Sequence, residues 1–402
     1  MAAAVSAGQS LYLDHAAATP LHPDVAAAMH RGAAESFANP SSPHAAGRRA
    51  RAALEDARDR IIALLGGRST GPGRDRLIFT SGATEANRIG LLGTAGATPA
   101  AVAISPRDHG SATDAAAELA ARGWRLHRLP LAPDGSAAAA AAAWAADEPG
   151  RVLVSMTLVC GQTGGRERLA TIGHEEVGHR VFVHGDATQA AAWDHLDFDR
   201  SPLTSLALAA HKFGGPRGIG GVLIRGGVDV KPLVPGPQEL GLRGGTEAVT
   251  LAIGFATALE LAAAQRDTER PRVAELRDRF EYLFCTAARR HGFEPLVVGA
   301  VGDRAPHIST VAARGCDRQA FVMACDLAGL CLATGTACAS GSSDPAPAVV
   351  ALDLPGWVPP AAVRASFASS TTTAEVEEAG RRLDEVFRRL AAAGLLRSPN
   401  AG

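Results

Sequence analysis

Hydrophobic and polar positions form two kinds of block along the first 250 residues. Short apolar runs predict strands at residues 77–80, 101–104, 125–129, 151–156, 181–183 and 205–210. Between them, apolar residues recur every three or four positions and predict helices, of which residues 45–65 and 111–122 are the clearest; a further helix is expected up to Gly178. Strands that alternate with helices predict an α/β fold, with a mostly parallel sheet covered by helices on both faces.

The pattern changes after Thr246. A long helical region at residues 247–290 contains a charged stretch, typical of a solvated helix that links two domains. Beyond it, a smaller α+β pattern is predicted, with strands at 295–298, 307–311 and 330–333 and helices at 320–328 and 373–393. The chain of 402 residues is long enough for two domains. We expect a large domain at 21–260 and a small domain made of 1–20 and 261–402.

Composition narrows the class of protein. The hydrophobic content of 47% and a net charge of -1 are typical of a soluble globular protein without a basic surface for nucleic acid. No apolar segment is long enough to span a bilayer, and no signal peptide is evident, so we expect no membrane partner and a cytoplasmic location. The six cysteines lack the spacing of a zinc site, so we expect free thiols and no metal.

Polar residues gather where the predicted strands end. They are Thr84, His109, Asp186, Gln189, His211 and Lys212. In an open parallel sheet the carboxyl ends of the strands line one crevice, where ligands bind. We therefore expect these side chains to share a site.

Lys212 stands out by composition. The chain has 40 basic residues, of which only Lys212 and Lys231 are lysine. A lysine amine can lose its proton and attack a carbonyl group, whereas a guanidinium cannot. Taken alone, the pattern is equally compatible with a surface lysine that closes a hairpin.

One cofactor would use this whole set of residues. Pyridoxal 5'-phosphate needs a lysine for its aldehyde, a carboxylate for its ring nitrogen, a flat group over the ring and a cradle for its phosphate. Lys212, Asp186 and His109 match the first three needs, and Thr84 with His211 matches the last. The small residues Gly82 and Ala83 let backbone N–H groups approach a phosphate at the start of a helix.

Several motifs together resemble a known family. They lie at residues 12–20, 39–42, 79–87, 186–189, 211–212, 236–246 and 334–340. The sequence is similar to the cysteine desulfurases of the class V aminotransferase group, which have the fold-type I architecture, and to the branch that serves iron-sulfur cluster assembly and nitrogenase.

The resemblance implies a reaction and further site residues. Cys338 corresponds to the cysteine that takes sulfur from L-cysteine as a persulfide and leaves L-alanine. Arg364 corresponds to the arginine that binds the substrate carboxylate, and Asn39 falls in a motif assigned to the substrate. Thr246 corresponds to a residue that reaches the phosphate in the other subunit, which implies a homodimer. The sulfur acceptor would be a protein, either a cluster scaffold or a sulfur carrier.

Two positions depart from the family pattern. Gly161 replaces a side chain that would bind the ring hydroxyl of the cofactor, and Ala209 replaces a serine that would bind its phosphate. Gln189 could reach the ring hydroxyl instead. Two alternatives therefore stay open: another class V enzyme, such as a selenocysteine lyase or an aminotransferase, and a paralogue without catalytic activity.

Overall fold

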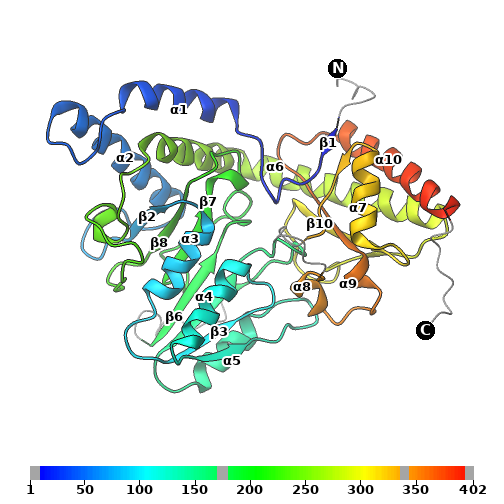
Figure 1. The fold of residues 1–402 in the computed structure, drawn as a ribbon, viewed down its shortest axis with the longest axis horizontal. Coiled ribbons are helices and arrows are strands. Elements are labelled where there is room, and N and C mark those ends of the chain that lie inside the picture. The colour runs from blue at the N-terminus through cyan, green and yellow to red at the C-terminus, as the bar shows by residue number, and fades with distance from the viewer. Residues whose placement is uncertain (1–9, 170–179, 336–343, 394–402) are drawn as a thin grey trace.

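The protein is described by a computed structural model that covers residues 10–169, 180–335 and 344–393. Figure 1 shows two groups of elements side by side. One is a large sheet together with its helices, and the other is a smaller group of strands and helices. The long helix α6 (Val249–Arg290) runs across both groups. The helix expected up to Gly178 falls largely on residues 170–179, outside the described part of the chain.

A seven-stranded sheet forms the centre of the larger group. Its spatial order is β2 (Arg76–Thr80), β8 (Gly220–Ile224), β7 (Ser205–Ala209), β6 (Val181–Asp186), β5 (Val152–Thr157), β3 (Ala101–Ile104) and β4 (Arg125–Arg128). Strand β8 is antiparallel to both of its neighbours, and all other neighbouring pairs are parallel. The predicted α/β fold with a mostly parallel sheet is confirmed.

Helices cover both faces of this sheet. They are α2 (Ala45–Leu64), α3 (Ala83–Arg88), α4 (Gly110–Ala121), α5 (Ala138–Asp147) and the first part of α6, and α1 (Pro23–Glu35) packs on the outside of α6. Alternate strand residues point to opposite faces. Leu77 and Phe79 accordingly join a core with α2, α5 and the first part of α6, whereas Ile78 between them joins a core with α3 and α4.

The smaller group contains two further sheets. Strands β12 (Ala362–Ser366), β10 (Ile308–Ala313) and β9 (Pro295–Val297) are antiparallel, and β1 (Leu11–Tyr12) pairs in parallel with β11 (Leu330–Cys331). Its helices are α7 (Arg318–Leu327), α8 (Pro347–Val350), α9 (Val358–Ala361) and α10 (Thr373–Ala392). Because β1 pairs with β11, the N-terminal segment starts in the small group before it crosses toward the large sheet.

Helix α6 contributes to two cores. Phe255 and Leu259 pack in a core of the large sheet, whereas Val273 and Phe280 pack in the core of the small group. The helix is continuous through Pro271. The domain boundary expected at residue 260 remains a prediction, and the change of core along α6 falls close to it.

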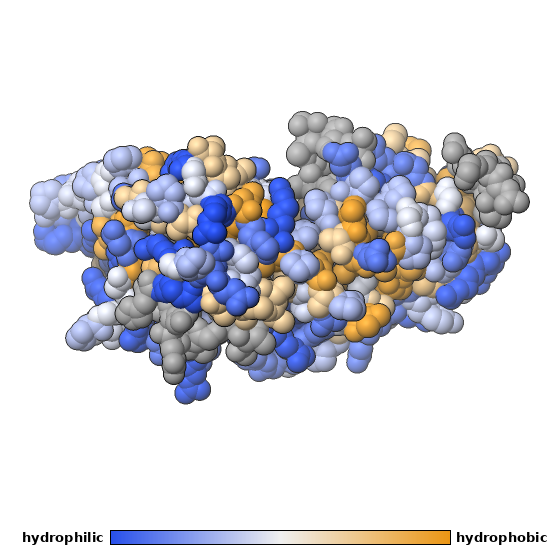
Figure 2. Space-filling view, turned by 90° about the horizontal axis from the view of Figure 1, so that it is seen from below, coloured by the Kyte–Doolittle hydropathy of each residue, from blue (hydrophilic) through white to orange (hydrophobic). Residues whose placement is uncertain are grey.

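Apart from the helix expected up to Gly178, the elements predicted above agree with the structure except at their ends. The helix expected at residues 45–65 is α2, and the strand expected at 101–104 is β3. The pattern from Pro23 predicts a helix that ends at Met29, whereas α1 continues to Glu35, because Val25, Ala28 and Gly32 share its buried face. In the described residues, no helix is both long and apolar enough to cross a membrane. In Figure 2 hydrophobic residues form separate patches among hydrophilic ones.

Candidate active site

Lys212 lies three residues after the end of β7. A short 3-10 helix (Ala210–Lys212) follows the strand, and its close approach to Gly215 leaves no room for a side chain there, since a Cβ would lie 2.7 Å from the carbonyl oxygen of Ala210. The Lys212 amine donates to the backbone oxygens of Ala16, at 2.8 Å, and Ala17, at 2.9 Å. The N-terminal segment therefore forms one wall of the site.

The surroundings of Lys212 favour its neutral form. Burial lowers the pKa of Lys212 to about 8, and the positive charge of Arg364 acts in the same direction. The carboxylates of Asp186 and Asp14 act in the opposite direction. Lys212, Asp186 and Arg364, which are widely separated in the sequence, are thus close enough for their charges to interact.

Asp186 is the last residue of β6 and is buried. Its Oδ2 accepts a hydrogen bond of 2.9 Å from Asn87 Nδ2, and its Oδ1 accepts one of 2.9 Å from the backbone N–H of Thr188. Each oxygen accepts one further hydrogen bond without losing these. The arrangement holds a carboxylate ready for an N–H group such as that of a pyridinium ring.

Arg364 extends from β12 and is also buried. Its Nη2 lies 2.7 Å from Asp14 Oδ1, and its Nη1 donates to the backbone oxygen of Gly161 at 2.9 Å. Its Nε is buried and has no acceptor among the described residues. A buried unpaired donor is uncommon and marks a position where a ligand oxygen is expected.

His109 and Gln189 are held by different contacts. His109 caps α4, and its Nδ1 accepts from the backbone N–H of Ser111 at 3.1 Å. Gln189 donates to the backbone oxygen of Ala16 at 2.8 Å and contacts His307 Nε2 at 3.2 Å. Both ends of its amide are occupied, so the suggestion that Gln189 replaces the side chain missing at Gly161 stays a prediction.

The residues predicted for the phosphate lie at the ends of β2 and β7. Gly82 precedes α3, Ala83 and Thr84 form its first turn, and a Cβ on Gly82 would meet only open space. Gly220 of β8 packs against this turn, and a Cβ there would lie 2.7 Å from the Gly82 carbonyl carbon. Burial, and then the charges of Lys212 and Arg217, lower the pKa of His211 to about 4.

Asn39 and Thr246 lie together in a different place. Both are exposed and line a depression of about 400 Å³ together with Phe37. None of the residues that line this depression lines the cavity beside Lys212. Cys338, predicted to accept sulfur, lies outside the described residues.

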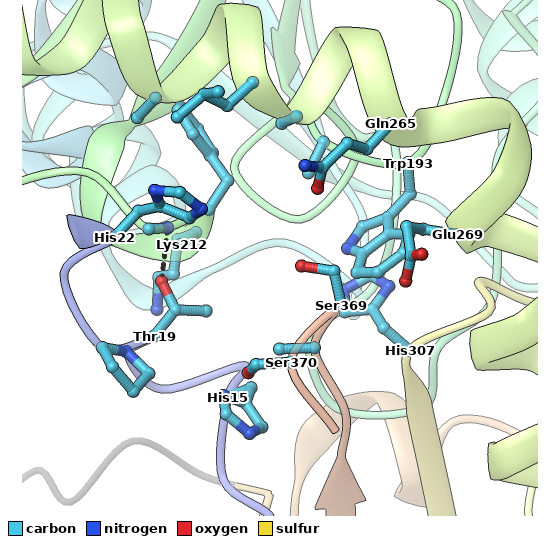
Figure 3. Close-up of a pocket in the computed structure, with 18 of the residues that line it drawn as sticks. His15, Thr19, His22, Trp193, Lys212, Gln265, Glu269, His307, Ser369 and Ser370 are labelled. Carbon is cyan, nitrogen blue, oxygen red and sulfur yellow. Dashed lines mark hydrogen bonds between the residues drawn. The ribbon is translucent and has the colours of Figure 1, made fainter. Parts of the chain in front are cut away.

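The cavity beside Lys212 has a volume of about 170 Å³ (Figure 3). Lys212 and His22 lie on one side of it, and Trp193 and His307 lie on the other with their rings stacked at 5.0 Å. Burial lowers the pKa of His307 to about 3. Of the predicted site residues that the structure describes, Lys212 is the one that lines this cavity, and His307 of the cavity wall contacts Gln189 at 3.2 Å.

Sequence reasoning missed several residues of this region. They are Asp14, Asn87, Trp193, His184 and His307. A signal existed for two of them. His184 interrupts an apolar strand two positions before Asp186, and Asn87 follows a strand end by less than two helical turns.

The residues present fit pyridoxal 5'-phosphate. Asp186 has free acceptor positions, and the buried hydroxyl of Thr188 beside it has no partner among the described residues. The backbone at Gly82 faces open space at the start of a helix, as a phosphate cradle requires. Lys212 supplies an amine with a lowered pKa. Asp186, His109 and Lys212 would hold the ring, and Gly82, Ala83, Thr84 and His211 would hold the phosphate.

Comparisons with known proteins agree with this geometry. The model of the family described as aminotransferase class-V matches residues 11–378. A cysteine desulfurase of Bradyrhizobium diazoefficiens is 32% identical over 400 residues, which is 95% of each chain. A solved structure described as a NifS-like protein superposes with a TM-score of 0.83 and 22% identity, and covers 95% of this chain and 100% of that one.

The description of a third relative names a bound ligand. The structure of SspA in complex with cysteine is 25% identical, with a TM-score of 0.73, and covers 90% of this chain and 100% of that one. The family match spans most of the sequence, and the relatives match over nearly their full length. The chain belongs to the class V aminotransferase family of pyridoxal 5'-phosphate enzymes, among the cysteine desulfurases.

Proposed function

We propose that this protein is a cysteine desulfurase, which converts L-cysteine to L-alanine and passes the sulfur to its own Cys338. The observation that carries the proposal is the meeting of three charged groups, since the Lys212 amine lies within electrostatic reach of both Asp186 and Arg364. An amine, an acid for a ring nitrogen and a cation for a substrate carboxylate are what an amino-acid reaction on this cofactor needs.

Each of these side chains has a part in the reaction. The bound cofactor holds the amino group of the substrate and draws electrons from its α-carbon. Arg364 orients the substrate through its carboxylate, and its unpaired Nε is the donor available for that contact. Lys212, with a pKa of about 8, is able to take up and return a proton near neutral pH.

Sulfur transfer is assigned to Cys338. Its thiolate attacks the sulfur of the substrate, a sulfur–sulfur bond forms, and the electron pair of the broken carbon–sulfur bond stays with the carbon skeleton, which takes a proton and leaves as alanine. The sulfur then passes to an acceptor thiol of a carrier or a cluster-scaffold protein. The relative whose structure contains cysteine supports the substrate.

The decisive experiment compares two cysteine variants. Purified protein is incubated with L-cysteine and a thiol, and alanine and sulfide are measured. We expect Cys338→Ser to form little of either product. Cys331→Ser is the matched control, because Cys331 is a partly buried free thiol in β11, and we expect it to keep wild-type rates. Full activity of Cys338→Ser would favour another class V reaction, and no activity in the wild type would favour a paralogue without catalysis.

A homodimer is also proposed. Phe37 is 73% exposed and lies with Asn39 and Thr246 around the depression described above. A large exposed aromatic side chain in a depression is favourable for contact with another protein surface. Thr246 of one copy would then face the phosphate site of the other. We expect Phe37→Asp to convert a dimer into a monomer in light scattering, and an unchanged dimer would contradict this interface.

A cytoplasmic location is the last part of the proposal. The five cysteines in the described part of the chain, from Cys160 to Cys331, are free thiols, as is usual for proteins of a reducing compartment. Fractionation of cells that express the protein tests this location.

A further inference from the structure

Asn87 connects the two groups predicted to contact the cofactor ring. It lies in α3 and is fully buried. Its Nδ2 donates to Asp186 Oδ2 at 2.9 Å and to Ser111 Oγ at 2.9 Å. Ser111 in turn contacts His109. The Asn87 side-chain nitrogen therefore contacts both Asp186 and the serine that holds His109.

The direction of these hydrogen bonds is fixed at two points. The Asp186 carboxylate can only accept, which assigns the amide nitrogen of Asn87 to its side. At the other end the backbone N–H of Ser111 can only donate, and it points to His109 Nδ1 at 3.1 Å. In the neutral ring of His109 the proton is therefore on Nε2.

His184 supports the far side of Asn87. Its Nε2 lies 3.0 Å from Asn87 Oδ1, and its Nδ1 lies 2.8 Å from Ser205 Oγ. Burial lowers the pKa of His184 to about 4, so the ring is neutral at pH 7. Because Asn87 Oδ1 accepts, the proton of His184 is on Nε2, and Ser205 donates to Nδ1.

The backbone is shaped to admit the His184 ring. A Cβ on Gly90 would lie 2.2 Å from His184 Nδ1 and 2.3 Å from Cε1, so no larger residue fits. Gly90 belongs to a π-helical turn (Ile89–Gly93) that directly follows α3. Such wide turns are rare and often occur at functional sites.

We propose that Asn87, held by His184, is a positioning residue that sets Asp186 and His109 as one hydrogen-bonded unit. Asp186 is kept as an oriented carboxylate, and His109 presents Nε2–H to the site while its Nδ1 is occupied. The inference rests on the proposed function, because it takes Asp186 and His109 as contacts of the cofactor ring. The hydrogen bonds themselves are present in the protein without cofactor.

The first test uses protein without cofactor. Nitrogen NMR of the labelled histidines distinguishes the two neutral forms of each ring. We expect both His109 and His184 to carry the proton on Nε2. A proton on Nδ1 of either ring would overturn the inference, whatever reaction the enzyme catalyses.

The second test uses cofactor binding. Asn87→Asp keeps an acceptor for His184 but removes both donated hydrogen bonds and places a second acid beside Asp186. Gly90→Ala leaves Asn87 in place but displaces its support. Hydrogen bonds to charged groups are worth enough that we expect affinity for pyridoxal 5'-phosphate to fall about 10- to 100-fold in either variant. The absorption spectrum of the bound cofactor should also shift at saturation.

Thr204→Val is the matched control. Thr204 is buried next to Ser205 and bonds the backbone oxygen of Val183, so it tests the loss of a nearby buried hydroxyl outside the network. We expect wild-type affinity and spectrum. Wild-type affinity and spectrum in Asn87→Asp would overturn the inference. If Gly90→Ala does not fold, the result for Asn87→Asp is sufficient by itself. Weaker binding in Asn87→Asp with no alanine from the wild type would instead contradict the desulfurase reaction alone.

Discussion

Asp14 Oδ1 lies 2.7 Å from Arg364 Nη2 and joins the N-terminal segment to β12. The same guanidinium donates to the backbone oxygen of Gly161. Two of its nitrogens are thus fixed from within the protein, and Nε is left without an acceptor in the described chain. A cation whose orientation is set in advance binds a carboxylate with little loss of side-chain freedom.

The first prediction concerns this arginine. Arg364→Lys keeps the charge but loses the planar set of donors, so it cannot serve Asp14, Gly161 and a substrate carboxylate together. We expect kcat/KM for L-cysteine to fall about 10- to 100-fold, measured as alanine formation. The control is Arg314→Lys, since Arg314 forms an exposed ion pair with Glu294. Equal activity of the two variants would contradict the role of Arg364.

The second prediction separates the two lysines. Lys212→Arg removes the amine that can react with an aldehyde and leaves a cation in its place. We expect alanine formation to fall by about 10²- to 10⁴-fold and the visible absorbance of bound cofactor to be lost. Lys231 is the other lysine of the chain and is exposed, so Lys231→Arg should keep both properties. Retained absorbance in Lys212→Arg would place the reactive amine elsewhere.

The third prediction follows from the lowered pKa of Lys212, which is about 8 in the folded protein against 10.5 for an ordinary lysine. The unfolded chain binds more protons between these two values, so folding stability should rise with pH across that window. Below pH 8, where the amine is charged, the free energy of unfolding is lower by about 3 kcal/mol, and this difference disappears near pH 10.5.

Unfolding by denaturant measures this effect in protein without cofactor. Lys212→Met should be more stable than the wild type at pH 7.5, and the difference should shrink as pH approaches 10.5. A difference that does not change with pH would show that Lys212 is not the group responsible.

The fourth prediction concerns the departure at Gly161. A Cβ there would lie 3.7 Å from the Gln189 side chain, an ordinary contact, so Gly161→Asn should fold and bind pyridoxal 5'-phosphate more tightly than the wild type. Gly164 is the contrast, because its φ is +76° and a Cβ would lie 3.0 Å from the Ile308 carbonyl oxygen. Gly164→Ala should lower the melting temperature. Equal or weaker cofactor binding in Gly161→Asn would mean that the missing side chain is not a ligand here.

Local patterns were enough to predict most of the helices and strands. Lys212 and His109 follow buried strands and Asp186 ends one, so a parallel sheet brings them to the same edge, and their shared role in a site stays a prediction. The end of α1 does not follow from the local pattern, because Gly32 continues its buried face without any change in composition.

Contacts between distant segments could not be predicted from local patterns. Asp14 and Arg364 are 350 residues apart, and the stack of Trp193 on His307 joins the large sheet to the small group. The backbone conformation at Glu239 also depends on residues that are distant in the sequence. Its φ is +47°, unusual for a residue other than glycine, and it is held by a buried ion pair with Arg58 and a hydrogen bond from the N–H of Phe79.

The most direct test of the account is the fate of the sulfur atom. The protein is treated with less than one equivalent of L-cysteine, its free thiols are blocked, and its peptides are examined by mass spectrometry. We expect one additional sulfur atom on the peptide that contains Cys338, in an amount that matches the alanine formed. Alanine without added sulfur on that peptide, or added sulfur on another cysteine, would contradict it.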